Sequence, residues 1–364
     1  MKIGILTFFR FNYGAILQAY ALQTVLTSLG HSAEIIDYEA SHRIESLFTS
    51  WTSTKGVALN LSTILRYRKF IERNERIAAF RRQNLHVSEK RYYSSEDLEK
   101  SLLEYDAFIC GSDQVWHPRA DHDCNRAYFL GFVKQDQAIK TSYAPSFGVS
   151  SVSQSFQKEI QPWLTDIPNL SVREETGRAI IEQVAGRLSA VVLDPTLLLK
   201  SDQWGRIAAP STVKPPYILV YTTSQRGLFP QLVKHVKKTT RLPLVVLSLT
   251  ALNLIPMADR VIYDAGPSEF VGLFANATCV CTNSFHGTAF SIIYRKPFWS
   301  VPHNATNSRV ADLLNRIGLS NRQVSALDQF PEWPLKIDYT AANSLFDGER
   351  RQSIVFLKTA LQQP

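Results

Sequence analysis

At the start of the chain, strand-like apolar runs alternate with a segment whose apolar residues have helical spacing. Residues 2–8 are a nearly continuous apolar run, which predicts a buried strand. Residues 16–29 carry apolar side chains at helical spacing and are followed by Gly30, a residue suited to end a helix. Residues 31–38 predict the next strand. This order is typical of a doubly wound α/β sheet, whose ligands bind at loops after the strands, and residues 12–15 form the first such loop.

The alternation resumes after a segment of different character. Residues 41–105 are less regular and helical in composition. Strand-like apolar runs then recur at residues 106–110, 140–144, 170–172 and 191–193. Prolines cluster at residues 210–216, which predicts a boundary there. We therefore expect a first α/β domain at residues 1–210, with a helical insertion at about 41–105.

A second α/β unit follows the prolines. Its strand-like runs lie at residues 217–222, 244–249, 260–262 and 277–281. Residues 340–362 predict a helix near the end of the chain. We expect a second domain at residues 211–338 and a C-terminal helix at 339–364 that packs back on the first domain.

Composition agrees with two soluble domains. The chain has 364 residues, of which 45% are hydrophobic and 20% charged, enough apolar material for two cores. Its first residues are too short an apolar run for a signal peptide, and no later segment approaches the roughly 20 apolar residues that cross a bilayer. We expect a cytoplasmic protein, with the inner face of the membrane as an alternative location. The four cysteines predict small buried side chains.

The formal net charge of +8 suits an anionic partner. Nucleic acid is disfavoured, because the sequence has no nucleic-acid-binding signature and no basic stretch interleaved with aromatic residues. The most basic stretch is residues 66–82, and an apolar face runs along it, formed by Ile64, Tyr67, Ile71, Ala78 and Phe80. This pattern predicts a surface helix that packs its apolar face inward. Contact with a membrane surface or a lipid-linked substrate is the alternative.

Residues 282–290 hold the most informative local pattern. They follow an apolar strand and lead into a short apolar helix, so His286 is expected at a helix N-terminus capped by Ser284. The free N–H groups and the positive dipole end suit a phosphate or carboxylate, and Gly287 would let the backbone approach the ligand closely. The local pattern equally allows a buried histidine that caps its own helix.

Several common catalytic motifs are missing. The sequence has no Walker motif, no Gly-x-Gly-x-x-Gly after the first strand, no Gly-x-Ser-x-Gly and no His-Glu-x-x-His. His117 and residues 121–124 could be taken for a metal cluster, but they lie in a polar stretch without periodicity, where a solvated loop is expected. We therefore predict no metal site.

A series of short blocks runs in order through nearly the whole chain. They lie at residues 12–15, 17–23, 111–116, 143–148, 171–174, 194–196, 266–270, 283–291, 296–298 and 307–309. Together these blocks resemble the polysaccharide pyruvyl transferase family. The resemblance implies an α/β fold of two Rossmann-like domains facing a cleft, similar to the B-type glycosyltransferase fold.

The resemblance also implies an activity. Members transfer the enolpyruvyl unit of phosphoenolpyruvate to two hydroxyls of a sugar in a surface polysaccharide or exopolysaccharide precursor, which gives a pyruvate ketal and phosphate. The expected partners are phosphoenolpyruvate as donor and a sugar or lipid-linked oligosaccharide as acceptor, with no nucleic acid, no metal and no organic cofactor. The sequence specifies neither the acceptor sugar nor an oligomeric state.

The roles that the resemblance implies centre on His286, which either donates a proton or, as imidazolium, stabilises the departing phosphate. Arg173 would clamp the phosphate or carboxylate, or else pair with Glu174 or Glu175. Asp113 would act as base for a sugar hydroxyl, or merely cap the next turn. Further substrate-binding residues are expected at Asn12, Gly14, Ser112, Gln114, Ser284, Gly287 and Arg309.

Some positions differ between branches of the family or allow two roles. Ser284 stands where other branches have an arginine two residues before the histidine, and Arg309 resembles a basic anion-binding residue downstream of it. Trp116 would stack on a sugar ring or belong to the core. Two other functions are open: a B-type glycosyltransferase that uses a nucleotide sugar, and a non-catalytic protein of glycan assembly.

Overall fold

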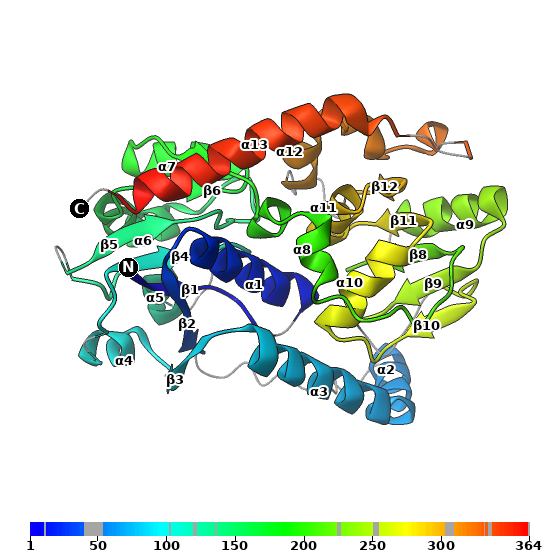
Figure 1. The fold of residues 1–364 in the computed structure, drawn as a ribbon, viewed down its shortest axis with the longest axis horizontal. Coiled ribbons are helices and arrows are strands. Elements are labelled where there is room, and N and C mark those ends of the chain that lie inside the picture. The colour runs from blue at the N-terminus through cyan, green and yellow to red at the C-terminus, as the bar shows by residue number, and fades with distance from the viewer. Residues whose placement is uncertain are drawn as a thin grey trace.

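The structure, a computed structural model, describes most of the chain. The described residues are 1–10, 12–39, 54–101, 103–118, 122–134, 137–223, 227–249, 255–302, 309–330, 332–333 and 337–362, with the backbone alone described at 54–56, 58–59 and 122–124. Within them the chain forms two parallel five-stranded sheets with helices packed around them (Figure 1). The chain passes from one sheet to the other in a span that contains the expected boundary at residue 210.

The first sheet is entirely parallel, in the order β3-β2-β1-β4-β5. Its strands are β1 Lys2–Leu6, β2 Ser32–Tyr38, β3 Val87–Tyr92, β4 Ala107–Cys110 and β5 Ile139–Ser142. The short strands β6 Ser171–Val172 and β7 Ala190–Val191 pair with each other, and a bridge between Thr141 and Asn169 joins them to β5. The helices of this part are α1 Tyr13–Ser28, α4 Ser95–Lys100, α5 His122–Tyr128, α6 Gln154–Asp166 and α7 Glu175–Ala185.

Helix α1 begins earlier than the sequence pattern indicates. The loop expected at residues 12–15 is wrong, because Tyr13 already belongs to the helix. Asn12 Oδ1 accepts a hydrogen bond from Ala15 N at 2.8 Å and so caps the first turn. The other end agrees with expectation: the helix stops before Gly30, whose φ of 87° is a conformation that glycine adopts without strain.

The second sheet is also entirely parallel, in the order β10-β9-β8-β11-β12. Its strands are β8 Ile218–Tyr221, β9 Leu244–Leu247, β10 Arg260–Ile262, β11 Cys279–Thr282 and β12 Phe298–Ser300. The helices that follow β7 are η1 Pro195–Leu198, α8 Ser201–Gly205, α9 Phe229–Thr240, α10 Pro267–Asn276, α11 Phe285–Ile293, α12 Arg309–Arg316, η2 Ser320–Arg322 and η3 Leu327–Gln329. Cys110, Cys279 and Cys281 are buried and unpaired, which confirms the small-hydrophobe role expected for them; the side chain of Cys124 lies outside the described part.

The segment expected as a helical insertion is helical only in part. It contains α2 Thr54–Leu65 and α3 Tyr67–Asn84, but β3 then forms the outer strand of the first sheet. The prediction missed this strand because its sequence, VSEKRY, has little apolar character, as suits an edge strand. Residues 40–53 lie outside the described residues.

The face of α3 that packs inward also differs from the expected one. Phe80 is buried as expected, but Ile64, Tyr67 and Ile71 are 51%, 48% and 39% exposed, and Phe70 is buried instead. The helix breaks at Arg66, so Ile64 belongs to α2 and does not share a face with the residues of α3.

Helix α3 uses its basic side chains to contact the second sheet's domain. Lys69 Nζ donates to Asp264 Oδ2 at 2.7 Å, and Arg76 Nη1 donates to the Asp264 carbonyl at 2.9 Å. Arg73 Nη1 donates to the Leu249 carbonyl at 2.8 Å. Much of the positive charge of this stretch is therefore committed within the molecule.

Aromatic packing and the C-terminal helix tie the two parts together. The Tyr13 hydroxyl of α1 donates to the Ala265 carbonyl at 2.9 Å, and the Tyr13 ring lies 5.1 Å from that of Phe270. Helix α13 Tyr339–Ala360 runs along the molecule (Figure 1) and contacts the first part, where Ser353 Oγ accepts from Leu193 N at 2.9 Å. No helix in the described ranges has the length and apolar character needed to span a membrane.

Candidate functional site

A buried carboxylate, Asp194, lies at the centre of a polar cluster where the two parts meet. Its Oδ2 atom accepts hydrogen bonds from Arg173 Nη1 and Ser112 Oγ, both at 2.8 Å. Its Oδ1 atom accepts from Thr196 Oγ1 at 2.6 Å and Thr196 N at 3.0 Å. His286 Nε2 lies 3.6 Å from Oδ2, a contact between potential charges that is too long for a good hydrogen bond.

The order of the sheets explains why these residues meet. Ser112, Arg173 and Asp194 each follow a strand of the first part, namely β4, β6 and β7, so they lie at the carboxyl ends of parallel strands. His286 follows β11 of the second sheet in the same sense. Carboxyl ends of parallel strands are where α/β proteins bind ligands.

His286 occupies the first turn of α11, as expected. The Ser284 side chain accepts a hydrogen bond from Gly287 N at 3.4 Å and caps the helix. His286 is only 8% exposed because its imidazole packs against α1: a Cβ on Gly14 would lie 2.0 Å from His286 Nδ1. The histidine thus spans the junction between the two parts, and does not cap its own helix.

Gly287 lies where its own domain is tightly packed. A Cβ there would lie 2.2 Å from Thr282 Oγ1 and 3.1 Å from the Tyr221 ring. The glycine therefore allows α11 to pack closely on its own sheet, and the crowded side of the residue faces protein.

Arg173 is a nearly buried cation with incomplete pairing. The residue is 3% exposed, and its guanidinium lies 4.3 Å from the centre of the Phe285 ring. The expected alternative, a pair with Glu174 or Glu175, holds for Glu174, whose Oε2 lies 3.9 Å from Nε. Asp194 is the closer acid, at 2.8 Å from Nη1, and Glu175 pairs with Arg178. Nε and Nη2 are buried and have no hydrogen-bond partner among the described residues.

Charges in the cluster influence one another strongly. Burial raises the pKa of the Asp194 carboxyl, but the neighbouring His286 and Arg173 outweigh it and hold that pKa well below its usual range. Burial also raises the pKa of Glu174. Burial, and then repulsion by Arg173, lowers the pKa of Arg309 to about 10. Carboxylates that oppose this last shift are Glu174, Asp113 and Asp194.

The remaining predicted residues lie around this cluster in different roles. Asp113 is 9% exposed with a φ of 76°, a strained value for a non-glycine residue, and its Oδ1 accepts from Gln114 N at 2.8 Å. Gln114 packs against Gly148, where a Cβ would lie 1.9 Å from Nε2. Asn12 caps α1, as described above. Trp116 belongs to the core, since it is fully buried and stacks on Phe129 at 4.7 Å.

The resemblance assigned no role to Asp194, although the sequence holds a signal for it. It directly follows the apolar run that becomes β7, and Pro195 begins η1 immediately after it. An acid at the end of a parallel strand is a candidate site residue by position alone. Its partners, however, come from β4, β6 and α11, and only the fold brings them together.

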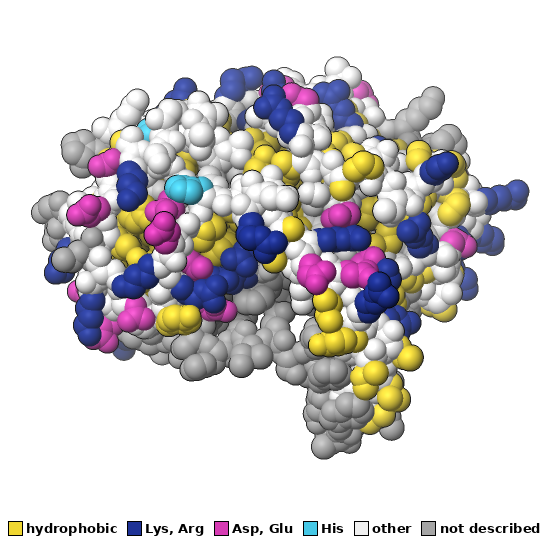
Figure 2. Space-filling model, turned by 60° about the horizontal axis from the view of Figure 1, so that its bottom comes forward, with side chains coloured by type: hydrophobic (Ala, Val, Ile, Leu, Met, Phe, Trp, Pro, Cys, Tyr) yellow, Lys and Arg dark blue, Asp and Glu magenta, His cyan; other side chains and the backbone are white. Residues whose placement is uncertain are grey.

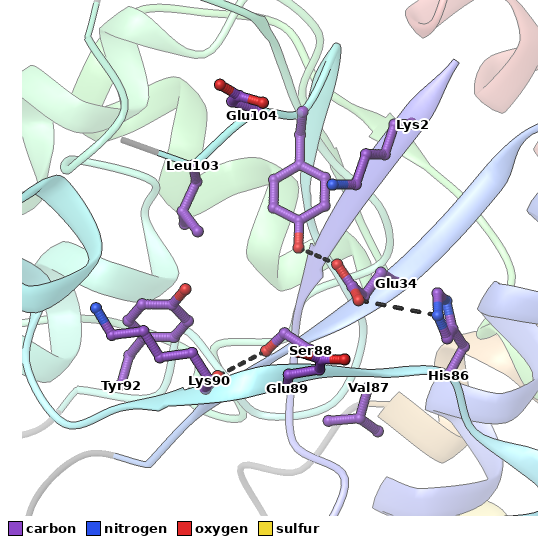
Figure 3. A pocket seen from close by; sticks show the side chains of 11 residues that line it. Lys2, Glu34, His86, Val87, Ser88, Glu89, Lys90, Tyr92, Leu103 and Glu104 are labelled. Atoms are coloured by element: carbon purple, nitrogen blue, oxygen red, sulfur yellow. Dashed lines mark hydrogen bonds and ion pairs between the residues drawn. The ribbon is translucent and has the colours of Figure 1, made fainter. Parts of the chain in front are cut away.

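A separate surface pocket of about 500 Å³ lies away from this cluster (Figure 3). It follows the edge strand β3 and the start of β1, where the Tyr105 hydroxyl donates to Glu34 and His86 Nε2 lies 3.9 Å from the same carboxylate. Its acidic and basic side chains are mixed and partly paired, which favours no particular ligand.

Metal-ligating side chains do not gather in groups of three or more in the part of the chain that the structure describes. Of the cluster that the sequence analysis set aside, Asp121 and the side chains of residues 122–124 lie outside that part.

Comparison with known proteins places the chain in a family. The sequence model described as polysaccharide pyruvyl transferase matches residues 12–304. The chain belongs to the polysaccharide pyruvyl transferase family. That span contains every predicted site residue except Arg309. Membership in this family supports a transferase activity. The comparison with curated proteins found no match.

Solved structures confirm the fold class. A putative UDP-N-acetylglucosamine 2-epimerase from Listeria monocytogenes aligns with a TM-score of 0.50 and 9% identity, over 99% of this chain and 89% of the other. A UDP-GlcNAc 2-epimerase from Methanocaldococcus jannaschii aligns with a TM-score of 0.51 and 10% identity, over 95% of this chain and 92% of the other. The Streptomyces sp. SF2575 glycosyltransferase SsfS6 aligns with a TM-score of 0.43 and 11% identity, over 99% of this chain and 96% of the other. The two parallel sheets and the epimerase matches show two Rossmann-like domains, as expected.

Proposed function

We propose that the protein transfers the enolpyruvyl unit of phosphoenolpyruvate to two hydroxyls of a sugar, in a precursor of a surface polysaccharide or exopolysaccharide. The products are a cyclic pyruvate ketal and phosphate. Family membership supports pyruvyl transfer. The observation that carries the choice of donor is the buried Arg173 guanidinium, two of whose nitrogens have no hydrogen-bond partner within the described residues.

The charge of the cluster suits this donor. Buried N–H groups without acceptors are unfavourable, and two guanidinium groups close enough to repel each other add to that cost. A small ligand with both a phosphate and a carboxylate supplies acceptors and negative charge at once. Asp194 and Glu174 already pair with Arg173, so the donor's anionic groups are proposed to accept from the guanidinium N–H groups that these carboxylates leave without a hydrogen-bond acceptor.

The proposed reaction balances without an oxidant or reductant. A proton adds to the methylene carbon of the donor while one sugar hydroxyl oxygen bonds to C2 and gives up its proton. The second hydroxyl then bonds to C2 as the C2–O bond to phosphate breaks, and its proton leaves to a base or to phosphate. His286 is proposed to deliver the first proton, or as imidazolium to stabilise the departing phosphate.

The other residues of the cluster have proposed roles in binding the two substrates and in holding Asp194. Arg173 and Arg309 are proposed to bind the donor's anionic groups. Asp113 is proposed as the base for a sugar hydroxyl, and its charge opposes the lowering of the Arg309 pKa. Ser112 is fully buried with its hydroxyl against Asp194, so its proposed contribution is to hold that carboxylate.

The test is a direct assay of donor consumption. Purified protein is incubated with phosphoenolpyruvate and a panel of free, nitrophenyl-linked and lipid-linked sugars. Phosphate release and a product heavier than the acceptor by one pyruvate ketal are expected. Consumption of a nucleotide sugar with phosphoenolpyruvate untouched would establish the glycosyltransferase alternative. Binding of an anionic glycan without turnover would support the non-catalytic alternative.

Replacing Arg173 by lysine is expected to raise the KM for phosphoenolpyruvate by about 10- to 100-fold, because lysine keeps the charge but loses the planar fork of donors. Steady-state kinetics with varied donor measure this change. Arg178→Lys is the matched control, since that side chain is 51% exposed and pairs with Glu175 on the surface. An unchanged KM in Arg173→Lys would remove this residue from the donor site.

Replacing Gly14 by alanine is expected to lower kcat by about 100-fold, because the added Cβ would lie 2.0 Å from His286 Nδ1 and displace the imidazole. Gly205→Ala is the control: its Cβ meets nothing within 4 Å, so the rate should stay near that of the wild type. Rates and thermal melting are measured for both variants. A normal kcat in Gly14→Ala would mean that the imidazole's position against α1 does not matter for turnover.

A further inference from the structure

A cluster of exposed apolar side chains lies at the corner between α2 and α3. Eleven large hydrophobic side chains are exposed among the described residues, and five of them fall within residues 61–71. They are Leu61 at 52%, Ile64 at 51%, Leu65 at 83%, Tyr67 at 48% and Ile71 at 39% exposed. Figure 2 shows hydrophobic side chains grouped on a projection from the body of the molecule. Single exposed apolar residues need no explanation, but a group of this kind does.

The spacing of these residues makes two continuous stripes. Leu61, Ile64 and Leu65 are three and four residues apart on α2, so they share one face. Tyr67 and Ile71 are four residues apart on α3, and only Arg66 separates the two helices. We call residues 61–71 the apolar corner.

Contacts on the inward side of the corner hold it in place. Phe70 is buried, its ring 6.3 Å from that of Tyr263, and the Arg66 guanidinium lies 5.0 Å from the Tyr263 ring. Lys69 bonds to Asp264 beside them. The inward side of the helix is thus already satisfied, and Tyr67 and Ile71 are left on the outward side.

Charge around the corner identifies its partner. Arg66, Arg68 and Lys69 lie within it, and the Arg68 side chain is 92% exposed. Glu72 pairs with both Arg68 and Lys69, and Asp264 also pairs with Lys69, so these two carboxylates offset part of this charge. The whole chain carries a formal net charge of +8, so a second copy would be repelled and an anionic surface attracted.

We propose that the apolar corner docks the protein on an anionic lipid surface. Leu61, Ile64, Leu65, Tyr67 and Ile71 enter the boundary between headgroups and acyl chains, while the exposed Arg68 side chain faces the headgroups. One short corner of this kind gives reversible binding. The proposal does not depend on the pyruvyl transfer reaction, because lipid binding needs no substrate.

The test is co-sedimentation of the full-length protein with vesicles. Binding is expected to vesicles of phosphatidylcholine with phosphatidylglycerol, to be much weaker with phosphatidylcholine alone, and to fall as salt is added. Leu65→Glu is expected to lower the partition coefficient by about tenfold or more, since burying a leucine side chain supplies at least that much. Leu188→Glu is the matched control, because Leu188 is equally exposed, at 84%, on a different part of the molecule.

Each other outcome would overturn the proposal. Wild-type protein that stays in the supernatant with anionic vesicles has no lipid-docking surface. Equal losses in Leu65→Glu and Leu188→Glu would show that added negative charge, and not the corner, weakens binding. A dimer that forms without vesicles and is lost only in Leu65→Glu, as measured by light scattering, would assign the corner to a second copy of the chain. Circular dichroism establishes that both variants are folded.

Discussion

Replacing His286 by alanine is expected to lower kcat for ketal formation by about 1,000-fold, within the range for a lost general acid. The fold should survive. Nε2 has no hydrogen-bond partner in the described part of the chain, so removing the imidazole breaks no hydrogen bond of Nε2. Asp194 would keep its hydrogen bonds from Arg173, Ser112 and Thr196. Steady-state kinetics at saturating donor and acceptor, with circular dichroism, measure the two expectations.

His235 provides the control for His286. It lies on α9 of the second part, where its ring is 5.2 Å from that of Phe330 and outside the polar cluster. His235→Ala should therefore keep kcat within about twofold, as most substitutions away from a site do. If His286→Ala also kept a near-normal rate, the histidine would be a structural contact between α11 and α1.

Replacing Asp194 by asparagine is expected to cost about 3–5 kcal/mol of unfolding free energy, because it removes one partner of a buried ion pair. Both carboxylate oxygens accept hydrogen bonds, one from Arg173 and Ser112 and the other from Thr196. An amide presents its NH₂ group to one of these sets of donors, and the charge opposite Arg173 is lost. Urea denaturation at pH 7 measures the cost. Turnover should fall as well, since Asp194 holds Arg173 and faces His286.

The pH dependence of this difference has a definite sign. The pKa of Asp194 is lowered in the folded protein, so its charge stabilises the fold above the unfolded value of about 4 and that contribution is lost as the pH falls. The stability gap between wild type and Asp194→Asn should therefore be largest near neutral pH and shrink below about pH 4.

Asp259→Asn is the control for Asp194. Its carboxylate pairs with Lys237 at 2.6 Å, but the side chain is 51% exposed, and surface pairs contribute about 0–1 kcal/mol. If Asp194→Asn cost no more than this control, Asp194 would not be the centre of the cluster's electrostatics.

Many elements follow from local pattern because their cause is local. The apolar run at residues 2–8 became β1, and the helical repeat before Gly30 became α1. Ser284 caps α11 as its position suggests, since a cap acts on the next turn of the same chain. The sequence pattern did not predict the edge strand β3, because a strand exposed at a sheet edge carries few apolar residues.

The site residues divide in the same way. His286 and Arg173 stand out through their place after strands and through the resemblance to the family. Asp194, which touches or faces both, has no partner nearby in sequence. The contact between Gly14 and His286 joins residues 272 positions apart in the chain, and no local spacing predicts it.

The sequence by itself determined the strand and helix alternation, the two-sheet α/β class, the Ser284 cap of α11 and the family. These depend on side chains near one another in the chain or on blocks in a fixed order. Only the tertiary structure decided that Asp194 joins Arg173 and His286, and that Lys69 of α3 bonds to Asp264 of the second part. It also decided that five large apolar side chains within residues 61–71 stay exposed. Burial and charge pairing depend on which segments, far apart in the sequence, come into contact. Tertiary packing determines those contacts.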